Sequence, residues 1–255
     1  MPIHVRIDQG VAELVLDQPP VNALASAGWV ELAEALHAVS RGDAVNAVLI
    51  RAEGRGFCAG VDIKELAADP GAIVRVNRAC YDAFAAIQDC AVPVIAACHG
   101  FVLGGGIGIA GSCDVVLASE DASFGLPEID RGALGAATHL MRMFPVQKVR
   151  RMFFTGEPIT AQEAFRLGAL EAVLPREALL PQARALATKI ASKSPLALRL
   201  AKQALNGIEP LDLKRSYRFE QGLTLELYQS PDSQEARDAF VQKREPRFAK
   251  PPQKG

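Results

Sequence analysis

The chain has 255 residues and 49% of them are hydrophobic, which is enough for one α/β domain with a large apolar core. Its formal net charge of −1 and its scattered basic residues argue against a nucleic-acid-binding protein, because such proteins usually carry a basic stripe. The sequence has no apolar run of about 18 residues and no signal-peptide pattern at its N-terminus, so we expect a cytoplasmic protein.

Short apolar runs alternate with helical patterns over the first half of the chain. A strand is expected within residues 1–10, and continuous apolar runs, typical of strands buried on both faces, follow at 11–16, 47–50, 94–98 and 115–118. Apolar residues at helical spacing occupy 26–39 and 71–89. This alternation predicts right-handed βαβ units and a sheet covered by helices.

Beyond residue 144 the pattern is almost entirely helical. The predicted helices cover 145–154, 161–167, 177–192, 195–206, 211–228 and 231–243, and a short strand is expected within 169–174. Pro231 suits the first position of the last helix, with Ser230 as its N-cap. We therefore predict an α/β core over residues 1–193 and a helical region over 194–255, which we expect to form an oligomer interface.

The five cysteines, at positions 58, 80, 90, 98 and 113, form no C-x-x-C pair and no zinc-ligand spacing. Most of them lie among apolar or small residues, so we expect reduced cysteines that fill the core. A chemical role stays open for Cys58, which lies in a glycine-rich loop. No metal site is predicted.

Two glycine-rich segments follow predicted strands and lead into helices. The first, EGRGFCAGVDIK, covers residues 53–64, and the second, HGFVLGGGIGIAG, covers residues 99–111. Glycine lets the backbone approach a ligand closely, and the N–H groups at a helix start have no partner within the helix. Because loops at the ends of parallel strands meet at one edge of a sheet, one N–H from each loop would form an oxyanion hole for an enolate or a tetrahedral intermediate.

Residues 106–111 also match the G-x-G-x-x-G pattern of dinucleotide-binding proteins. That fingerprint should directly follow the first strand, whereas residues 99–103 separate these glycines from a strand in mid-chain. A nicotinamide or flavin site is therefore disfavoured. The interpretation that these glycines serve only close helix packing stays open.

Glu128 is the strongest candidate for acid–base chemistry. It follows Pro127 and lies among Phe124, Leu126 and Ile129. Apolar surroundings raise the pKa of a carboxyl group, which suits proton transfer near neutral pH.

Asp130, Arg131 and His139 are candidate helpers for this glutamate. Asp130 and Arg131 could pair with each other at the surface, or one of them could reach the site. A lone histidine more often has a structural role, so His139 is the weaker candidate for catalysis. His99, beside the second glycine loop, is expected to order that loop by hydrogen bonding.

Together these segments resemble the crotonase, or enoyl-CoA hydratase/isomerase, family. The resemblance extends from about residue 10 to 248 and depends on the order and spacing of its motifs. The motifs are PPVNAL (19–24), RGFCAGVDIKE (55–65), PVIAACHGFVLGGGIGIAGSCDVVLAS (93–119), ASFGLPEI (122–129), FFTGEPITAQEAFRLGAL (153–170) and AFVQKREPRF (239–248). The resemblance implies a spiral of ββα units with a C-terminal helical trimerisation region, assembled as a trimer or a dimer of trimers. It also implies an acyl-CoA substrate and no tightly bound cofactor.

By motif position, the resemblance places the two oxyanion donors on the backbone N–H groups of Val61 and Gly105. Contacts with coenzyme A are implied at Ala59, Val61, Ile63, Lys64, Phe240 and Lys243. The first three would lend their backbone to the adenine and pantetheine pocket, and the lysine of the first loop would approach the phosphates. The two tail residues match positions that can reach the coenzyme A of a neighbouring subunit.

Two departures from the hydratase pattern affect the expected chemistry. Hydratases of the family carry two glutamates; Glu128 matches the second, whereas Gly108 stands at the first. The loop after PEI is also about two residues shorter than in hydratases. With GVDIK and GGGIG, the segments FGLPEIDRGALGAATHL (124–140) and SYRFEQGLTLEL (216–227) resemble a subgroup of actinobacterial cholesterol breakdown. Those enzymes hydrolytically open a steroid-derived ring in a bicyclic oxo-acyl-CoA.

The favoured hypothesis is therefore ring-opening C–C hydrolysis through a thioester enolate. Glu128 would activate water, and Asp130, Arg131 or His139 would assist. An ordinary enoyl-CoA hydratase or isomerase of fatty-acid β-oxidation is the alternative enzyme. A non-catalytic acyl-CoA-binding member, favoured by the missing first glutamate, and a serine peptidase with a Ser112–His139 pair are further alternatives.

Overall fold

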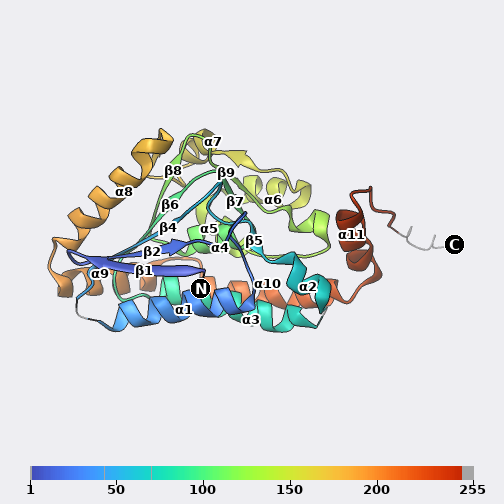
Figure 1. The fold of residues 1–255 in the computed structure, drawn as a ribbon, viewed down its shortest axis with the longest axis horizontal. Helices are drawn as coiled ribbons and strands as arrows, with labels where there is room; N and C mark the ends of the chain where they lie inside the picture. The colour runs from blue at the N-terminus through green and yellow to red at the C-terminus, as the bar shows by residue number, and fades with distance from the viewer. Residues whose placement is uncertain (1, 43, 70, 249–255) are drawn as a thin grey trace.

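The computed structural model of the protein describes residues 2–42, 44–69 and 71–248 (Figure 1). At its centre lies a six-stranded sheet with the strand order β1-β2-β4-β6-β8-β11. β1 (Ile3–Asp8) pairs antiparallel with β2, and all the other neighbours pair in parallel. The parallel strands are β2 (Val11–Leu16), β4 (Ala47–Ala52), β6 (Val94–Cys98), β8 (Val115–Ser119) and β11 (Ala172–Leu174).

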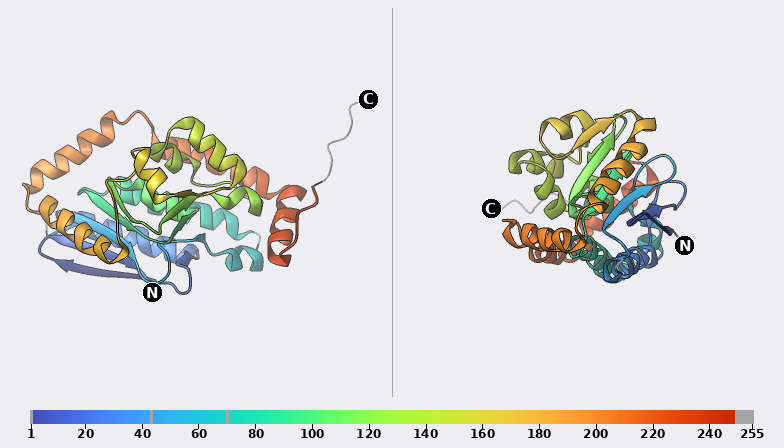
Figure 2. Two further views of the ribbon diagram at one scale, coloured as in Figure 1. Left: turned by 90° about the horizontal axis from the view of Figure 1, so that it is seen from above. Right: turned by 90° about the vertical axis from the view of Figure 1, so that its left-hand side faces the viewer.

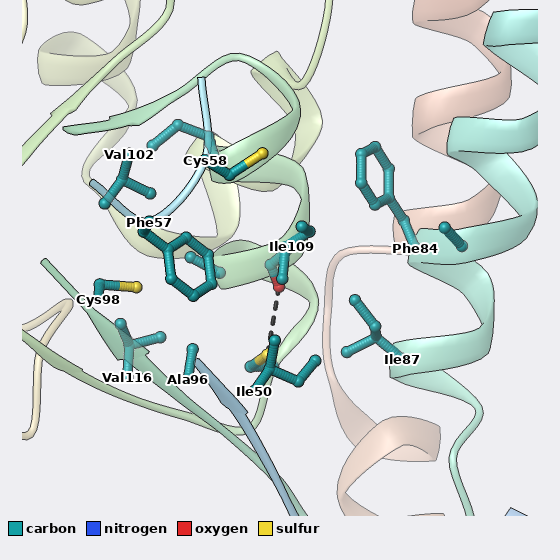
Figure 3. Close-up of a cluster of buried hydrophobic side chains, with 14 of the residues drawn as sticks. Ile50, Phe57, Cys58, Phe84, Ile87, Ala96, Cys98, Val102, Ile109 and Val116 are labelled. Atoms are coloured by element: carbon teal, nitrogen blue, oxygen red, sulfur yellow. Dashed lines mark hydrogen bonds between the residues drawn. The ribbon is translucent and has the colours of Figure 1, made fainter. Parts of the chain in front are cut away.

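One face of this sheet carries the large apolar core. Among the helices that contribute to it are α1 (Ser26–Arg41), α3 (Ala72–Gln88) and α4 (Gly105–Ser112). Figure 3 shows Ile109 of α4 between Phe57 of the first glycine loop and Ile87 of α3. Because α4 begins at the second glycine loop, this close packing fixes where that loop lies.

The other face of the sheet is covered by α8 (Arg176–Ala191), which runs beside the strands in Figure 1. Leu179 and Ala187 of this helix pack with Leu49 and Ile95 of the central strands. The sheet is therefore buried on both faces, as the continuous apolar runs predict.

Two small sheets connect the glycine loops with the segment that carries Glu128. β3 (Ala23–Leu24) pairs with β5 (Gly60–Val61), while β9 (Ser123–Gly125) pairs with β7 (Phe101–Leu103) and β10 (Ile159–Thr160). A single bridge between Cys58 and Val102 joins the first loop to β7. The 3-10 helix η1 (Pro127–Arg131) follows β9 directly, so pairing between short strands brings three distant segments to one place.

The remaining helices are α2 (Ile63–Ala68), α5 (Ala137–Met143), α6 (Val146–Thr155), α7 (Ala161–Arg166), α9 (Pro195–Ile208), α10 (Leu213–Tyr228) and α11 (Pro231–Gln242). Figures 1 and 2 place α11 at the opposite end of the molecule from α8 and α9. α10 packs against α3 and α5, and Glu220 accepts hydrogen bonds from the backbone N–H groups of Ala137 (2.7 Å) and Thr138 (2.9 Å). The helical region thus contacts the core. Its boundary at 193/194 stays a prediction, and residues 249–255 lie outside the described residues.

The long predicted elements are confirmed, with β2 and β6 at the predicted bounds and Ser230 capping α11 through the N–H of Ser233 (3.1 Å). The short strand expected within residues 169–174 is found as β11. The structure adds α5 and the two- and three-residue strands β3, β5, β7, β9 and β10, which were not predicted. Such short strands show no measurable periodicity, because pairing partners alone define them. In the part of the chain that the structure describes, no helix is long and apolar enough to cross a membrane.

Candidate active site

The two glycine loops meet at the backbone of Gly60 and Gly105. A Cβ added to Gly60 would lie 2.9 Å from the backbone nitrogen of Gly105, so only glycine permits this approach. The N–H of Asp62 donates to Leu24 of β3 (2.9 Å), and successive N–H groups of a strand point to opposite edges, so the N–H of Val61 points away from β3. Gly105 begins α4, and its N–H has no partner within the helix. Each loop therefore contributes one backbone N–H group that has no partner within its own strand pair or helix.

Glu128 lies against the second of these loops. A Cβ added to Gly104 would overlap Glu128 Oε1. Gly104 has φ +56° and ψ −116°, a backbone conformation that residues with a side chain rarely adopt. The carboxyl group thus approaches the glycine backbone directly, one residue from the N–H of Gly105.

Burial controls the acidity of this glutamate. Glu128 Oε2 is buried and has no hydrogen-bond partner among the described residues. Burial away from water raises the pKa of Glu128 to about 8, and the positive charge of Arg131 only partly opposes this shift. The predicted direction of the shift is confirmed. A buried carboxyl group without a partner is unfavourable for folding, and such groups are typical of reactive sites.

A cavity of about 300 Å³ connects the glycine loops with Glu128. From the predicted site, its walls include Ala59, Val61, Ile63, Gly105 and Glu128. The opposite wall comes from α3, α10 and α11 and includes Ile73, Val76, Phe84, Tyr217 and Tyr228. A mostly apolar cavity with a few convergent polar groups is typical of a small-molecule site.

Comparison with known proteins identifies the family. The family model described as "Enoyl-CoA hydratase/isomerase" matches residues 6–251. The chain belongs to this family. It is 52% identical over 240 residues to the "(7aS)-7a-methyl-1,5-dioxo-2,3,5,6,7,7a-hexahydro-1H-indene-carboxyl-CoA hydrolase" of Rhodococcus jostii (strain RHA1), covering 93% of each chain. It is 48% identical over 238 residues to the protein of the same name from Mycobacterium tuberculosis (strain ATCC 25618 / H37Rv), covering 92% of this chain and 96% of that one.

Solved structures of the family have the same fold. An enoyl-CoA hydratase/isomerase from Xanthobacter autotrophicus Py2 aligns with a TM-score of 0.88 at 27% identity, covering 98% of this chain and 99% of that one. An enoyl-CoA hydratase/isomerase from Pseudoalteromonas atlantica T6c aligns with a TM-score of 0.87 at 26% identity, covering 98% and 100%. The predicted crotonase-like spiral with C-terminal helices is therefore confirmed.

An aromatic ring fills the space beside Gly108, the position at which hydratases of the enoyl-CoA hydratase/isomerase family carry their first glutamate. A Cβ added to Gly108 would overlap the ring of Phe84. That ring packs edge-on against Trp29 (5.5 Å between centroids) and His139 (4.7 Å), so neighbouring rings hold it in place. The ring of Phe84 therefore occupies the space that a side chain at position 108 would need.

The three candidate helpers lie in different places. Arg131 lines the cavity, with its guanidinium carbon 4.7 Å from the ring centroid of Phe240, so its surface pairing with Asp130 is not the arrangement found. Asp130 is exposed, and its carboxylate lies beside the backbone of Gly156. His139 is outside the cavity lining and buried behind the aromatic wall, and this burial lowers its pKa to about 3. Of the three, only Arg131 reaches the cavity.

The predicted coenzyme A contacts gather at the cavity, with two exceptions. Residues 59, 61 and 63 and Phe240 belong to its lining. Lys64 is exposed in the first turn of α2, where its N–H donates to Asp62 (2.9 Å). Lys243 directly follows α11 and lies outside the lining.

Other predictions for this region have clear outcomes. The buried hydroxyl of Ser112 donates to a carbonyl of its own helix (2.7 Å), so the geometry assembles no Ser112–His139 peptidase pair. His99 Nε2 lies 3.2 Å from the carbonyl oxygen of Gly54, so its contact is with the first glycine loop and not with the second loop, which it was expected to order. All five cysteines are buried and free, and burial raises the pKa of Cys58 to about 12, in agreement with a packing role.

Apart from Phe240, the cavity wall from α10 and α11 was missed in the sequence. Tyr217, Thr224 and Tyr228 line the cavity from α10, and Gln234 and Arg237 line it from α11. The spacing of seven and four residues within α10 places its three residues on one helical face. That spacing was a usable signal, but it could not show that this face meets the site rather than another subunit.

Proposed function

We propose that the protein hydrolyses a carbon–carbon bond in a ring of a cyclic oxo-acyl-CoA thioester. The observation that carries this proposal is the single carboxyl group of Glu128 beside two backbone donors, with Phe84 filling the place of the second carboxylate. The names of the relatives at 52% and 48% identity describe hydrolases of a dioxo-hexahydro-indene-carboxyl-CoA and support this reaction class.

The reaction begins when ionised Glu128 takes a proton from water and the resulting hydroxide attacks a ring ketone next to the thioester-bearing carbon. The tetrahedral intermediate re-forms a C=O double bond as the ring C–C bond breaks. The electron pair passes into the thioester as an enolate, whose oxygen accepts hydrogen bonds from the N–H groups of Val61 and Gly105. Glu128 then returns its proton to the carbon. One water is consumed, the ketone becomes a carboxylic acid, and the thioester remains intact.

We assign the assisting role to Arg131 rather than to Asp130 or His139. Arg131 lines the cavity, and its charge favours the ionised form of Glu128 and the carboxylate product. Residues 59, 61 and 63 contact coenzyme A in this proposal, with Lys64, Phe240 and Lys243 near its outer part.

The direct test is ring opening in water enriched in oxygen-18. We expect a bicyclic β-oxo-acyl-CoA to gain the mass of one water, with the label in the new carboxylate, and crotonyl-CoA to be hydrated far more slowly. Mass spectrometry of the product locates the label. Rapid hydration of crotonyl-CoA with the cyclic substrate left intact would support the ordinary hydratase instead. Binding without turnover of either compound would support a non-catalytic member.

Gly108→Glu tests whether the protein is a hydratase that lacks only one carboxylate. We expect this variant to lose stability by about 1–3 kcal/mol and to gain no large hydratase activity, because the new side chain meets the ring of Phe84. Thermal unfolding and a crotonyl-CoA assay measure the two effects. The double variant Gly108→Glu/Phe84→Ala is the comparison, because the smaller alanine leaves room for the glutamate. A large gain in hydration by Gly108→Glu alone would contradict the packing argument.

We also propose a cytoplasmic homo-oligomer, a trimer or a dimer of trimers. Large apolar side chains are exposed on α9 and α10, and their burial in an interface would be favourable. They are Leu196, Leu200, Leu205, Ile208, Phe219 and Leu223.

A further inference from the structure

The cavity wall beside Glu128 is a loop that contains neither helix nor strand. Residues 132–136 join η1 to α5, and residues 133–136 line the cavity. The N–H of Ala133 donates to the carbonyl oxygen of Glu128 (3.0 Å), and a Cβ added to Gly135 would lie 3.9 Å from Glu128 Cγ. A shift of this loop would therefore move Glu128 or change the space in which Glu128 meets a substrate.

Side chains of the C-terminal helices hold this loop. Ser233 Oγ of α11 donates a hydrogen bond to the carbonyl oxygen of Gly132, and a Cβ added to Gly132 would overlap the backbone of Ser233. Thr224 Oγ1 of α10 donates to the carbonyl oxygen of Leu134 (3.1 Å). Because the carbonyl groups of a loop lack the partners that a helix or a sheet would provide, such bonds determine where the loop lies.

Glu220 of α10 makes three hydrogen bonds at the end of the loop. Its carboxylate is buried and accepts from the N–H groups of Ala137 (2.7 Å) and Thr138 (2.9 Å) and from Thr138 Oγ1 (2.8 Å). These N–H groups begin α5, whose N-cap, Ala136, has no side-chain oxygen to accept them. Ala136 also has φ +59°, which residues other than glycine rarely adopt. Glu220 therefore supplies the missing cap from another helix and holds the loop in an unfavourable conformation.

This contact joins the two segments that resemble the hydrolase subgroup. Glu220 and Thr224 belong to residues 216–227, and the loop that they hold belongs to residues 124–140. Glu220 is outside the cavity lining, so it acts on a bound substrate only through the loop. Burial raises the pKa of Glu220, whereas its three hydrogen-bond donors favour the ionised form that accepts them.

We propose that Glu220 is a positioning residue, which holds the cavity wall at residues 132–136 against Glu128. This inference deepens the proposed function and rests on it. The thioester is bound at the two glycine loops, so the distance from Glu128 to the attacked carbon depends on where the loop after η1 lies. Misplacement of reacting groups by about 1 Å can lower a rate roughly 100-fold. Glu220 takes no part in proton transfer.

The test is Glu220→Gln, which keeps the shape of the side chain but turns one accepting oxygen into an NH2 group beside backbone N–H donors. We expect kcat for ring opening to fall about 30-fold, because the loop moves. KM should stay within about threefold, since the proposed coenzyme A contacts lie on other segments. Hydrogen exchange of peptides that cover residues 133–140, measured by mass spectrometry, should become at least about 10-fold faster. Thr138→Val removes one of the three bonds and should show smaller changes in the same direction, also where Glu220→Gln does not fold.

Lys202→Met is the matched control for a loss of stability alone. The ammonium group of Lys202 is buried and pairs with the carboxylate of Asp114, and both residues are outside the cavity lining. Removal of one partner of a buried ion pair is destabilising. We expect this variant to unfold at a lower temperature than the wild type and to keep its kcat within about twofold.

The outcomes separate this inference from the proposed reaction. If the wild type opens no ring but hydrates crotonyl-CoA, and Glu220→Gln lowers kcat of that hydration with KM unchanged, ring opening is wrong and the role of Glu220 stands. If Glu220→Gln exchanges faster but keeps nearly the whole kcat of the wild type, the role of Glu220 is overturned. An equal loss of kcat in Lys202→Met would overturn it as well.

Discussion

Replacement of Glu128 by glutamine should lower kcat for ring opening by about a thousandfold. The amide has nearly the same shape as the carboxyl group but cannot take a proton from water, and general base catalysis contributes roughly 10²- to 10⁴-fold in enzymes. The oxyanion donors of both glycine loops are unchanged, so substrate affinity should stay within a few-fold of the wild type. Steady-state kinetics with the cyclic substrate measure both quantities. A variant with more than a tenth of the wild-type kcat would contradict the role of Glu128 as the base.

The pH dependence of the wild type provides a second signature of the same residue. Only ionised Glu128 can act as the base, and burial raises its pKa to about 8 in the empty site. kcat/KM, which reports ionisation in the free enzyme, should therefore rise with pH up to about 8 and then level off. This ascending limb should be absent from the residual activity of Glu128→Gln.

The pH dependence of folding stability provides the control for Glu128→Gln. The pKa of Glu128 in the folded protein, about 8, is above the ordinary value of 4.5 for a glutamate, so the folded state binds the proton more tightly. The resulting stabilisation is complete below about pH 4.5 and is lost as the pH rises through 8. Glutamine has no proton to lose, so the variant should gain stability relative to the wild type between pH 5 and 9. Thermal unfolding at both pH values distinguishes this gain from misfolding.

Gly104→Ala should lower kcat by about 100-fold or more. The new Cβ would overlap Glu128 Oε1, and the positive φ of this residue is strained for alanine. Both the carboxyl group and the adjoining N–H of Gly105 would move, and loss of one oxyanion donor alone costs roughly 10²- to 10³-fold.

Gly135→Ala is the matched control for Gly104→Ala. Its Cβ would lie 3.9 Å from Glu128 Cγ, an ordinary van der Waals contact with the same side chain. We expect its kcat to stay within about threefold of the wild type. Equal losses in the two variants would mean that the cavity tolerates no added methyl group, and that the close approach of Gly104 to Glu128 has no special role.

Much of the fold could be predicted because its signals are local. The apolar runs at 11–16 and 94–98 are strands buried on both faces, and Ser230 followed by Pro231 begins a helix. The special backbone conformation at Gly104 could be recognised in the sequence, because three successive glycines mark a segment free of the constraints that a side chain imposes. Glu128 could be singled out because its sequence neighbours are apolar and the fold buries it among them.

Other parts of the site depend on contacts between distant segments. That Phe84 fills the space beside Gly108 requires the packing of α3 on α4, and no local pattern reports it. The directions in which Asp130 and Arg131 point could not be predicted from a local pattern either. Arg131 faces the cavity and Asp130 faces Gly156, because one turn of a 3-10 helix directs neighbouring side chains to different sides.

The sequence by itself therefore determined the family, and it singled out the two glycine-rich loops and Glu128 as candidate site residues, since each depends on residue types at short range. Tertiary structure alone decided the contents of the cavity. It placed Tyr228 of α10 in the cavity lining, and the hydroxyl of that tyrosine is buried without a hydrogen-bond partner among the described residues. The physical reason is that burial and hydrogen-bond pairing are properties of the whole packed chain, whereas helical spacing shows only which residues share a face.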